Sequence, residues 1–290
     1  MPAQDGTECR PSPEINCGRS LSLCPKSTLF RGTVRRLEFG IRESPVFCLL
    51  YSVFCLLSLM PINSILISRK RCRLAPSHCV LTFDDGPAGK VTDDLLTVLQ
   101  EFGVKACFCL VGCQVANRPE QTRAIAAGGH LLVNHTFHHR FADLWDLERF
   151  SLDLARCDQV ICDALGETSH PLHWFRPPFG LVTAAVREVT RTRQILPVTH
   201  FVFDPWFRSD RAKMPAKWII EDAKRRQGGI YVLHDALITS GISRAMRGSP
   251  RRRWIPRAVN EILGELTTAG FQFPDPSQVF QEVGSPSWPF

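Results

Sequence analysis

From Val80 onward the chain alternates short apolar, β-branched runs with segments whose apolar residues recur at helical spacing. Turn residues such as Gly, Pro and Asp separate the two kinds of segment. This alternation predicts parallel βαβ units, which pack either as an α/β barrel or as a doubly wound sheet. The fold class expected for this part of the chain is therefore α/β.

The expected elements follow from this pattern. Strands are expected in CVLTF, KACFCLVG, HLLVNH, WFRPP, HFVFD and GIYVLHD. Thr92 is expected to cap the first helix and Gly103 to stop it. Helices are expected over residues 92–103, 119–128, 144–165, 183–191, 215–226 and 255–269.

Composition supports a globular chain. Its 290 residues suit one α/β barrel, and a hydrophobic fraction of 44% argues against disorder in the bulk of the chain. The net charge of +7 comes mostly from arginine clusters, including residues 243–254. A solvated loop explains that cluster, and an anionic or nucleic-acid partner is the weaker alternative.

Twelve cysteines are present, none after Cys162. Cys107 and Cys109 face the same side of a regular strand, and we interpret them as small buried apolar residues. No CxxC pair occurs, which argues against a cysteine zinc site, and free thiols fit a reducing compartment better than an oxidising one.

The N-terminal region has a different character. Residues 1–44 predict a poorly ordered extension, residues 45–68 an apolar segment and residues 69–77 a basic linker. The uncharged stretch 46–67 has the length of a membrane anchor, which predicts a membrane-associated protein whose following arginines favour a cytoplasmic domain. Packing on the domain is one alternative, and a cytoplasmic chain that starts at Met60 is another.

Four polar clusters fall where expected strands end: Asp84–Asp85, His135–His139, Arg176 and His234–Asp235. Reactive groups of parallel α/β barrels gather at the carboxyl ends of the strands. Polar residues placed at random would fall at both ends. The sequence therefore predicts one active site built from these clusters.

Each cluster has a chemical and a structural interpretation. Asp84 and Asp85 leave a strand in different directions, so one carboxylate can bind a metal while the other takes a proton; a solvated turn explains them equally well. His135 and His139 can face one ion across a helical turn, whereas His138 lies on another side. One Asp and two His suit a catalytic Zn²⁺ or a related divalent ion.

Two further residues complete the predicted site. His234 can act as a general acid near neutral pH, or merely cap its strand. Arg176 lies in a proline-fixed turn and can hold a carboxylate ionised, or be a surface residue.

Together these residues resemble the polysaccharide deacetylase family, also called the NodB-homology domain or carbohydrate esterase family 4. TFDDGP at 82–87 matches the first motif and HTFHH at 135–139 the second. RPPFG at 176–180 is similar to the third, with Phe for Tyr, and VLHD at 232–235 to the fifth, with Val for Leu. The resemblance covers residues 78 to about 273, which we assign to a domain over 78–275 followed by a tail over 276–290.

The resemblance implies a distorted (β/α)7-type barrel and a divalent metal, most often zinc. It implies that Asp85, His135 and His139 hold the metal, that Asp84 is the general base and that His234 is the general acid. Arg176 would orient Asp84, and the Phe179 N–H, next to Pro178, would stabilise the oxyanion.

The fourth motif departs from the family pattern D-x-x-D-W. Asp204 remains, but Phe207 and Arg208 replace the second Asp and the Trp. Trp206 or Phe207 can still supply an apolar wall of the acyl pocket, whereas rate and acyl specificity are open to change.

The expected function is metal-dependent removal of an N-acetyl group from a carbohydrate such as an N-acetylglucosamine polysaccharide. An O-acetyl esterase or a hydrolase of a non-sugar amide would need the same groups. A catalytically inactive glycan-binding protein is the alternative from another class.

Overall fold

A parallel β-sheet forms the centre of the computed structural model. The structure describes residues 66–67, 74–168, 172–189, 191–198, 200–201, 213–236 and 252–282. Within them the sheet has seven strands in the order β7-β5-β4-β3-β2-β9-β8, and every neighbouring pair is parallel. The strands are β2 (His78–Asp84), β3 (Cys107–Leu110), β4 (Leu131–Asn134), β5 (Trp174–Phe175), β7 (Gln194–Ile195), β8 (His200–Phe201) and β9 (Gly228–His234).

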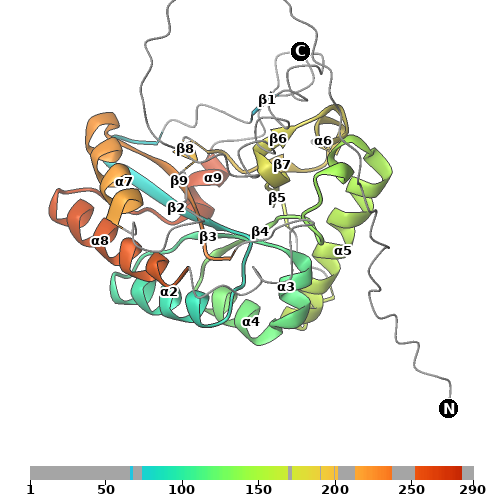
Figure 1. The fold of residues 1–290 in the computed structure, drawn as a ribbon, viewed down its shortest axis with the longest axis horizontal. Helices are drawn as coiled ribbons and strands as arrows, with labels where there is room; N and C mark the ends of the chain where they lie inside the picture. Colours follow the sequence, from blue (N-terminus) through green and yellow to red (C-terminus); the bar gives the residue numbers. More distant parts are fainter. Residues whose placement is uncertain are drawn as a thin grey trace, which may run out of the picture. The chain divides into compact units, whose positions relative to one another are not determined.

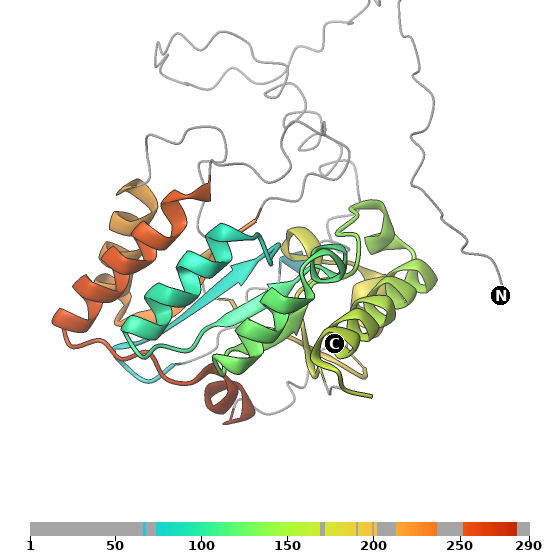
Figure 2. The same ribbon diagram turned by 90° about the horizontal axis from the view of Figure 1, so that it is seen from below.

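Helices cover the convex face of this curled sheet, side by side (Figures 1 and 2). Four short elements complete the described part of the chain: two 3₁₀ helices, η2 and η3, and two strands, β1 and β6. Strands β1 and β6 pair with each other in antiparallel orientation. The helices are α2 (Lys90–Glu101), α3 (Gly112–Asn117), α4 (Pro119–Ala127), α5 (Leu147–Leu165), α6 (Ala184–Val189), α7 (Lys213–Arg226), α8 (Trp254–Thr268) and α9 (Pro276–Glu282). The short elements are β1 (Leu66–Ile67), η2 (Ala142–Trp145), η3 (Pro178–Gly180) and β6 (Leu181–Val182).

Side-chain alternation along the strands divides the core into two layers. Leu81 and Phe83 of β2 point into the layer beneath the outer helices, whereas Val80 belongs to the inner layer with Cys107 and Cys109. Both faces of the strands are therefore covered, as a parallel sheet requires. The two thiols are buried and free, which confirms their interpretation as small apolar residues.

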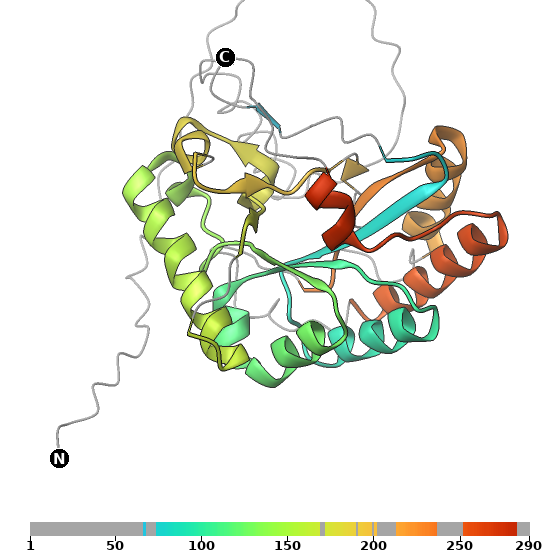
Figure 3. The same ribbon diagram turned by 180° about the vertical axis from the view of Figure 1, so that it is seen from behind.

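Helix α9 lies on the inner side of the sheet (Figure 3). Its Phe280 is buried in the inner layer, and its ring lies 5.5 Å from that of Trp174. The first part of the expected tail 276–290 is thus a packed helix, because its aromatic side chain covers apolar strand residues. The prediction of a distorted (β/α)7-type barrel is confirmed by the curled parallel sheet.

Two helix starts differ from the expectation. Helix α2 begins at Lys90, with Gly89 rather than Thr92 at the N-cap position. The hydroxyl of Thr92 instead accepts from the Ala88 N–H and donates to Asp235. In the segment expected as one helix from Leu144, the 3₁₀ helix η2 comes first, and Asp146 then caps α5 by accepting from the Arg149 N–H.

The N-terminal predictions lie almost entirely outside the described residues. Residues 1–65 belong to this part of the chain, and the last two residues of the stretch 46–67 form strand β1. In the described part of the chain, no helix combines the length and the apolar character that a bilayer crossing requires. The membrane segment remains a prediction.

Candidate metal and catalytic site

The predicted site residues meet at the carboxyl edge of the sheet. Asp84 ends β2 and pairs in register with His234, the last residue of β9. His135 follows β4, and Arg176 follows β5. Because these strands are parallel, their carboxyl ends lie at one edge and bring together side chains that are far apart in sequence.

Asp85, His135 and His139 form a compact group of potential ligands. Their ligand atoms all lie within 4.8 Å of one another, and all three side chains are buried. Oδ1 of Asp85 is 3.7 Å from Nε2 of His135 and 3.5 Å from Nε2 of His139. When ligand atoms lie about 2.0–2.2 Å from a tetrahedral ion, the distance between two ligand atoms is close to these two observed distances. The spacing of the three side chains therefore fits one divalent metal.

Both imidazoles can also present a nitrogen lone pair to a metal. Nδ1 of His135 lies 2.8 Å from the carbonyl oxygen of Arg176, so a proton on Nδ1 leaves Nε2 as a lone-pair donor. Burial lowers the pKa of His139 to about 4, and the neutral ring is the form that binds metal.

The loop 135–139 is not the helical turn that the four-residue spacing predicted. Thr136 and His139 have positive φ values of 66° and 55°. The side chain of Asn134 accepts from the Thr136 N–H, and the Thr136 hydroxyl accepts from the His139 N–H. Side-chain acceptors thus replace helical hydrogen bonds and turn both imidazoles toward Asp85.

Two neighbouring helices, α5 and α3, hold this loop by hydrogen bonds. The carboxylate of Asp153 on α5 accepts from the Phe137 N–H at 2.9 Å, from the His138 N–H at 3.0 Å and from Nδ1 of His138 at 2.5 Å. At the start of α3, the N–H groups of Gly112 and Cys113 donate to the loop carbonyls. No signal in the sequence marked Asp153, because it lies inside a helix with ordinary amphipathic spacing.

Arg176 and Asp84 form a buried ion pair. Nη1 of Arg176 lies 2.5 Å from Oδ1 of Asp84 and 2.7 Å from the Thr82 hydroxyl. Burial opposes ionisation of Asp84, but the guanidinium together with His135, His234 and the Cys109 thiol outweighs it, so the pKa of Asp84 lies below its ordinary value. The surface interpretation of Arg176 is wrong, since its side chain is only 2% exposed.

His234 and Asp235 have different surroundings. His234 is half-buried and lies next to Asp84 in the strand register. Asp235 is fully buried, and burial raises its pKa to about 7. Its Oδ2 accepts from the Thr92 hydroxyl at 2.5 Å, and a side chain at Gly86 would collide with the carboxylate. Asp235 therefore packs under the turn that carries Asp84 and Asp85.

The remaining predicted residues divide into two groups. Pro178 is buried in η3, whereas Phe179 is 47% exposed with a φ of 60°. The ring of Phe179 lies 4.7 Å from that of His139, so the third motif borders the ligand group. Asp204, Trp206 and Phe207 lie outside the described residues.

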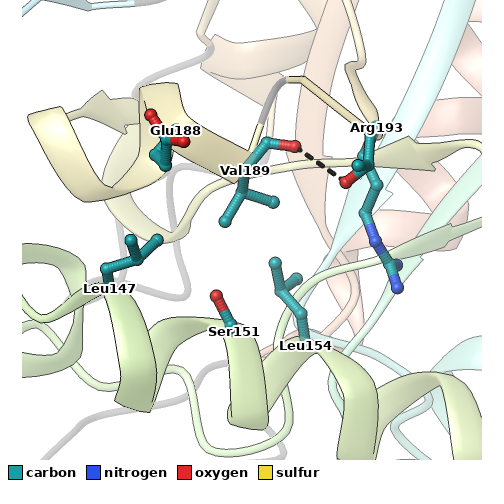
Figure 4. Close-up of a pocket in the computed structure, with 7 residues that line it drawn as sticks. Leu147, Ser151, Leu154, Glu188, Val189 and Arg193 are labelled. Carbon is teal, nitrogen blue, oxygen red and sulfur yellow. Dashed lines mark hydrogen bonds between the residues drawn. The ribbon is translucent and has the colours of Figure 1, made fainter.

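A pocket of about 380 Å³ opens elsewhere, between α5 and α6 (Figure 4). One of its residues, Arg193, pairs with Asp158. None of the predicted site residues lines it, so it is separate from the ligand group. Its lining consists of Leu147, Ser151, Leu154, Glu188, Val189, Thr192 and Arg193.

Comparison with known proteins gives consistent matches. The family model for polysaccharide deacetylase matches residues 73–198. A chitooligosaccharide deacetylase of Bradyrhizobium sp. (strain ANU 289) is 32% identical over 205 residues, which are 66% of this chain and 85% of the relative. A peptidoglycan-N-acetylglucosamine deacetylase of Bacillus cereus (strain ATCC 14579) is 26% identical over 207 residues, 69% of this chain and 87% of the relative.

A solved structure agrees with these relatives. A family 4 acetyl xylan esterase from Clostridium thermocellum, in complex with a cobalt ion, aligns with a TM-score of 0.57 and 26% identity. The alignment covers 72% of this chain and 93% of the esterase.

Proposed function

The chain belongs to the polysaccharide deacetylase family, and from this premise we propose that it hydrolyses the N-acetyl group of an N-acetylglucosamine polysaccharide with the help of a divalent metal. The observation that carries the proposal is the juxtaposition of the ligand group with the buried Asp84–Arg176 pair. The names of the deacetylases to which the chain is similar support an N-acetylated sugar as substrate.

Asp85, His135 and His139 would hold the metal. Two imidazole nitrogens and one carboxylate oxygen form a donor set that suits zinc and leaves room for water and substrate. The contribution of the metal, once bound, is to make water more acidic and to polarise the acyl carbonyl. Zinc is the proposed ion.

The protein's own groups move the protons. Asp84, kept ionised by Arg176, accepts a proton as water attacks the carbonyl carbon. The backbone N–H of Phe179 donates to the oxygen that gains charge, an interaction strongest in the transition state. His234 gives a proton to the amine nitrogen as the carbon–nitrogen bond breaks, so the products are acetate and a free amino sugar.

An ester substrate is the second candidate. The similarity to an acetyl xylan esterase favours it, because an O-acetyl group needs the same nucleophile and the same oxyanion donor. An alcohol leaving group depends less on protonation than an amine does. Truncation of His234 should therefore impair amide hydrolysis more than ester hydrolysis.

The experiment that tests the proposed function combines metal content with acetate release. The purified chain is analysed for bound metal without chelator treatment and supplied with N-acetylglucosamine oligomers or acetylated xylan, before and after metal removal. Metal-dependent release of acetate from the oligomers is the expected result. Release from xylan alone would favour the esterase, and bound metal without acetate from either would favour an inactive glycan-binding protein.

A further inference from the structure

Three aromatic side chains gather beside the ligand group: Phe141, Trp145 and Phe179, which we call the aromatic patch. The ring of Phe141 lies 4.6 Å from that of Trp145 and 5.4 Å from that of Phe179. Phe179 in turn lies 4.7 Å from the imidazole of His139. The patch thus continues directly from a proposed metal ligand.

Two of these rings remain open to solvent. Phe141 is 37% exposed and Phe179 is 47% exposed, although the two rings contact each other edge to face. Adjacent exposed aromatic rings are costly in water and often mark ligand-binding grooves. Trp218, another exposed aromatic residue, lies on α7 and contacts Tyr231 instead.

Polar residues border the patch in the sequence. Arg140, immediately before Phe141, is exposed, and Asp146, immediately after Trp145, forms a partly exposed ion pair with Arg149. An apolar surface with a polar border matches the chemistry of a pyranose ring, whose C–H groups lie on its faces and whose hydroxyls lie at its rim. Aromatic faces carry negative charge density that attracts the C–H groups.

We propose that the aromatic patch is a subsite for a second sugar ring, next to the sugar whose acetyl group is removed. This inference rests on the proposed function, because the reacting sugar must lie over the ligand group. A neighbouring ring of the same glycan can then extend past His139 and stack on Phe141. The contact with His139 favours a glycan over a protein partner, since it makes the patch continuous with the reaction site.

The test compares substrates of different length in Phe141 variants. Acetate release is measured with the N-acetylglucosamine monomer and tetramer for the wild type, Phe141→Ala and Phe141→Trp. In Phe141→Ala the preference for the tetramer in kcat/KM should fall about tenfold, equivalent to about 1.4 kcal/mol, mainly through a higher KM. Phe141→Trp should retain the preference, because it restores an aromatic face.

The matched control is Leu152→Ala, which truncates an exposed apolar side chain on α5 outside the patch. It should preserve the tetramer preference. If Phe141→Ala also preserves it, the subsite is overturned. A lower melting temperature with unchanged KM would likewise overturn it and would indicate that the patch is covered by protein instead.

Direct binding separates this inference from the proposed function. Calorimetric titration of the wild type and Phe141→Ala with the tetramer requires no turnover. Weaker binding by Phe141→Ala without acetate release from the wild type would support the stacking of a sugar on the aromatic patch and refute the hydrolase. Acetate release with equal tetramer binding by both proteins would support the hydrolase and refute the subsite.

Discussion

Nη1 of Arg176 lies 2.5 Å from Oδ1 of Asp84, with both side chains buried beneath the reaction site. A charge in this position is stable only while its partner is present. The pair links β5 to β2 and keeps the general base ionised. Stability and catalysis therefore depend on the same contact.

Removal of the guanidinium should affect both properties. Arg176→Ala should lower the free energy of unfolding by about 3–5 kcal/mol, because it leaves a buried carboxylate without its counter-charge. Activity should fall, and its acidic limb should move to higher pH, because the pKa of Asp84 rises. Denaturant unfolding and a pH–rate profile measure the two effects.

Arg191→Ala provides the control, since Arg191 forms an exposed pair with Glu188 that should contribute at most about 1 kcal/mol. If Arg176→Ala proves too unstable to assay, Arg176→Lys retains a positive charge and allows the pH profile to be measured. Because the charge is kept, Arg176→Lys should leave the acidic limb close to its wild-type position. Wild-type stability and an unchanged acidic limb in Arg176→Ala would contradict the role of the ion pair.

The two adjacent aspartates should differ in their effect on metal. Asp84→Asn should retain bound zinc but lose acetate release by about 10²–10⁴-fold, because it removes the proton acceptor. Asp85→Ala should lose the zinc itself, because it removes one of three protein ligands. Elemental analysis of the purified variants measures retention, and Asp94→Asn, in an exposed pair with Lys90, is the control. Equal zinc content in the two variants would refute the division of roles.

Asp153 should control metal affinity without touching the metal. Asp153→Ala removes the acceptor of three hydrogen bonds from the loop 135–139 and should weaken zinc binding by about 10- to 100-fold. Competition with a chelator measures the affinity. Asp163→Ala, on the exposed side of the same helix, should bind zinc like the wild type. Wild-type affinity in Asp153→Ala would show that the loop holds its geometry without this anchor.

His130, which lies at the amino end of β4 and away from the proposed metal ligands, should make the stability of the fold depend on pH. Burial lowers its pKa to about 4, below the ordinary 6.5, and its Nδ1 accepts from the Ala106 N–H. The folded state thus resists protonation, so the contribution is complete above pH 6.5 and decreases as the pH falls toward 4. The loss is of the order of 1–3 kcal/mol.

Denaturant unfolding of the metal-free protein between pH 4 and 7 measures this contribution. His130→Asn keeps an acceptor but cannot be protonated, so its stability should fall less steeply than that of the wild type. Parallel curves for the two proteins would exclude His130 as the source.

The residue pattern was sufficient to predict an α/β fold and the identity of most polar residues at the carboxyl edge of its sheet, whereas the barrel was implied by the family resemblance. Strand periodicity and the parallel βαβ pattern determine which end of each strand a residue occupies, and this placed Asp84, His135, Arg176 and His234 at one edge. These are properties of local chain geometry. A pattern of neighbouring residues therefore predicts them.

The tertiary structure decided the geometry of the groups at that edge. Four-residue spacing predicted a helical turn for His135 and His139, but Asn134 and Thr136 hold a non-helical loop that Asp153 anchors from α5. Thr92 looked like a helix cap, yet its hydroxyl donates to Asp235 on β9. In each case a buried side chain makes the deciding hydrogen bond, and Asp153 and Asp235 lie in segments distant from the groups they hold. Local periodicity carries no information about such contacts, because they form only when packing excludes water from competing donors and acceptors.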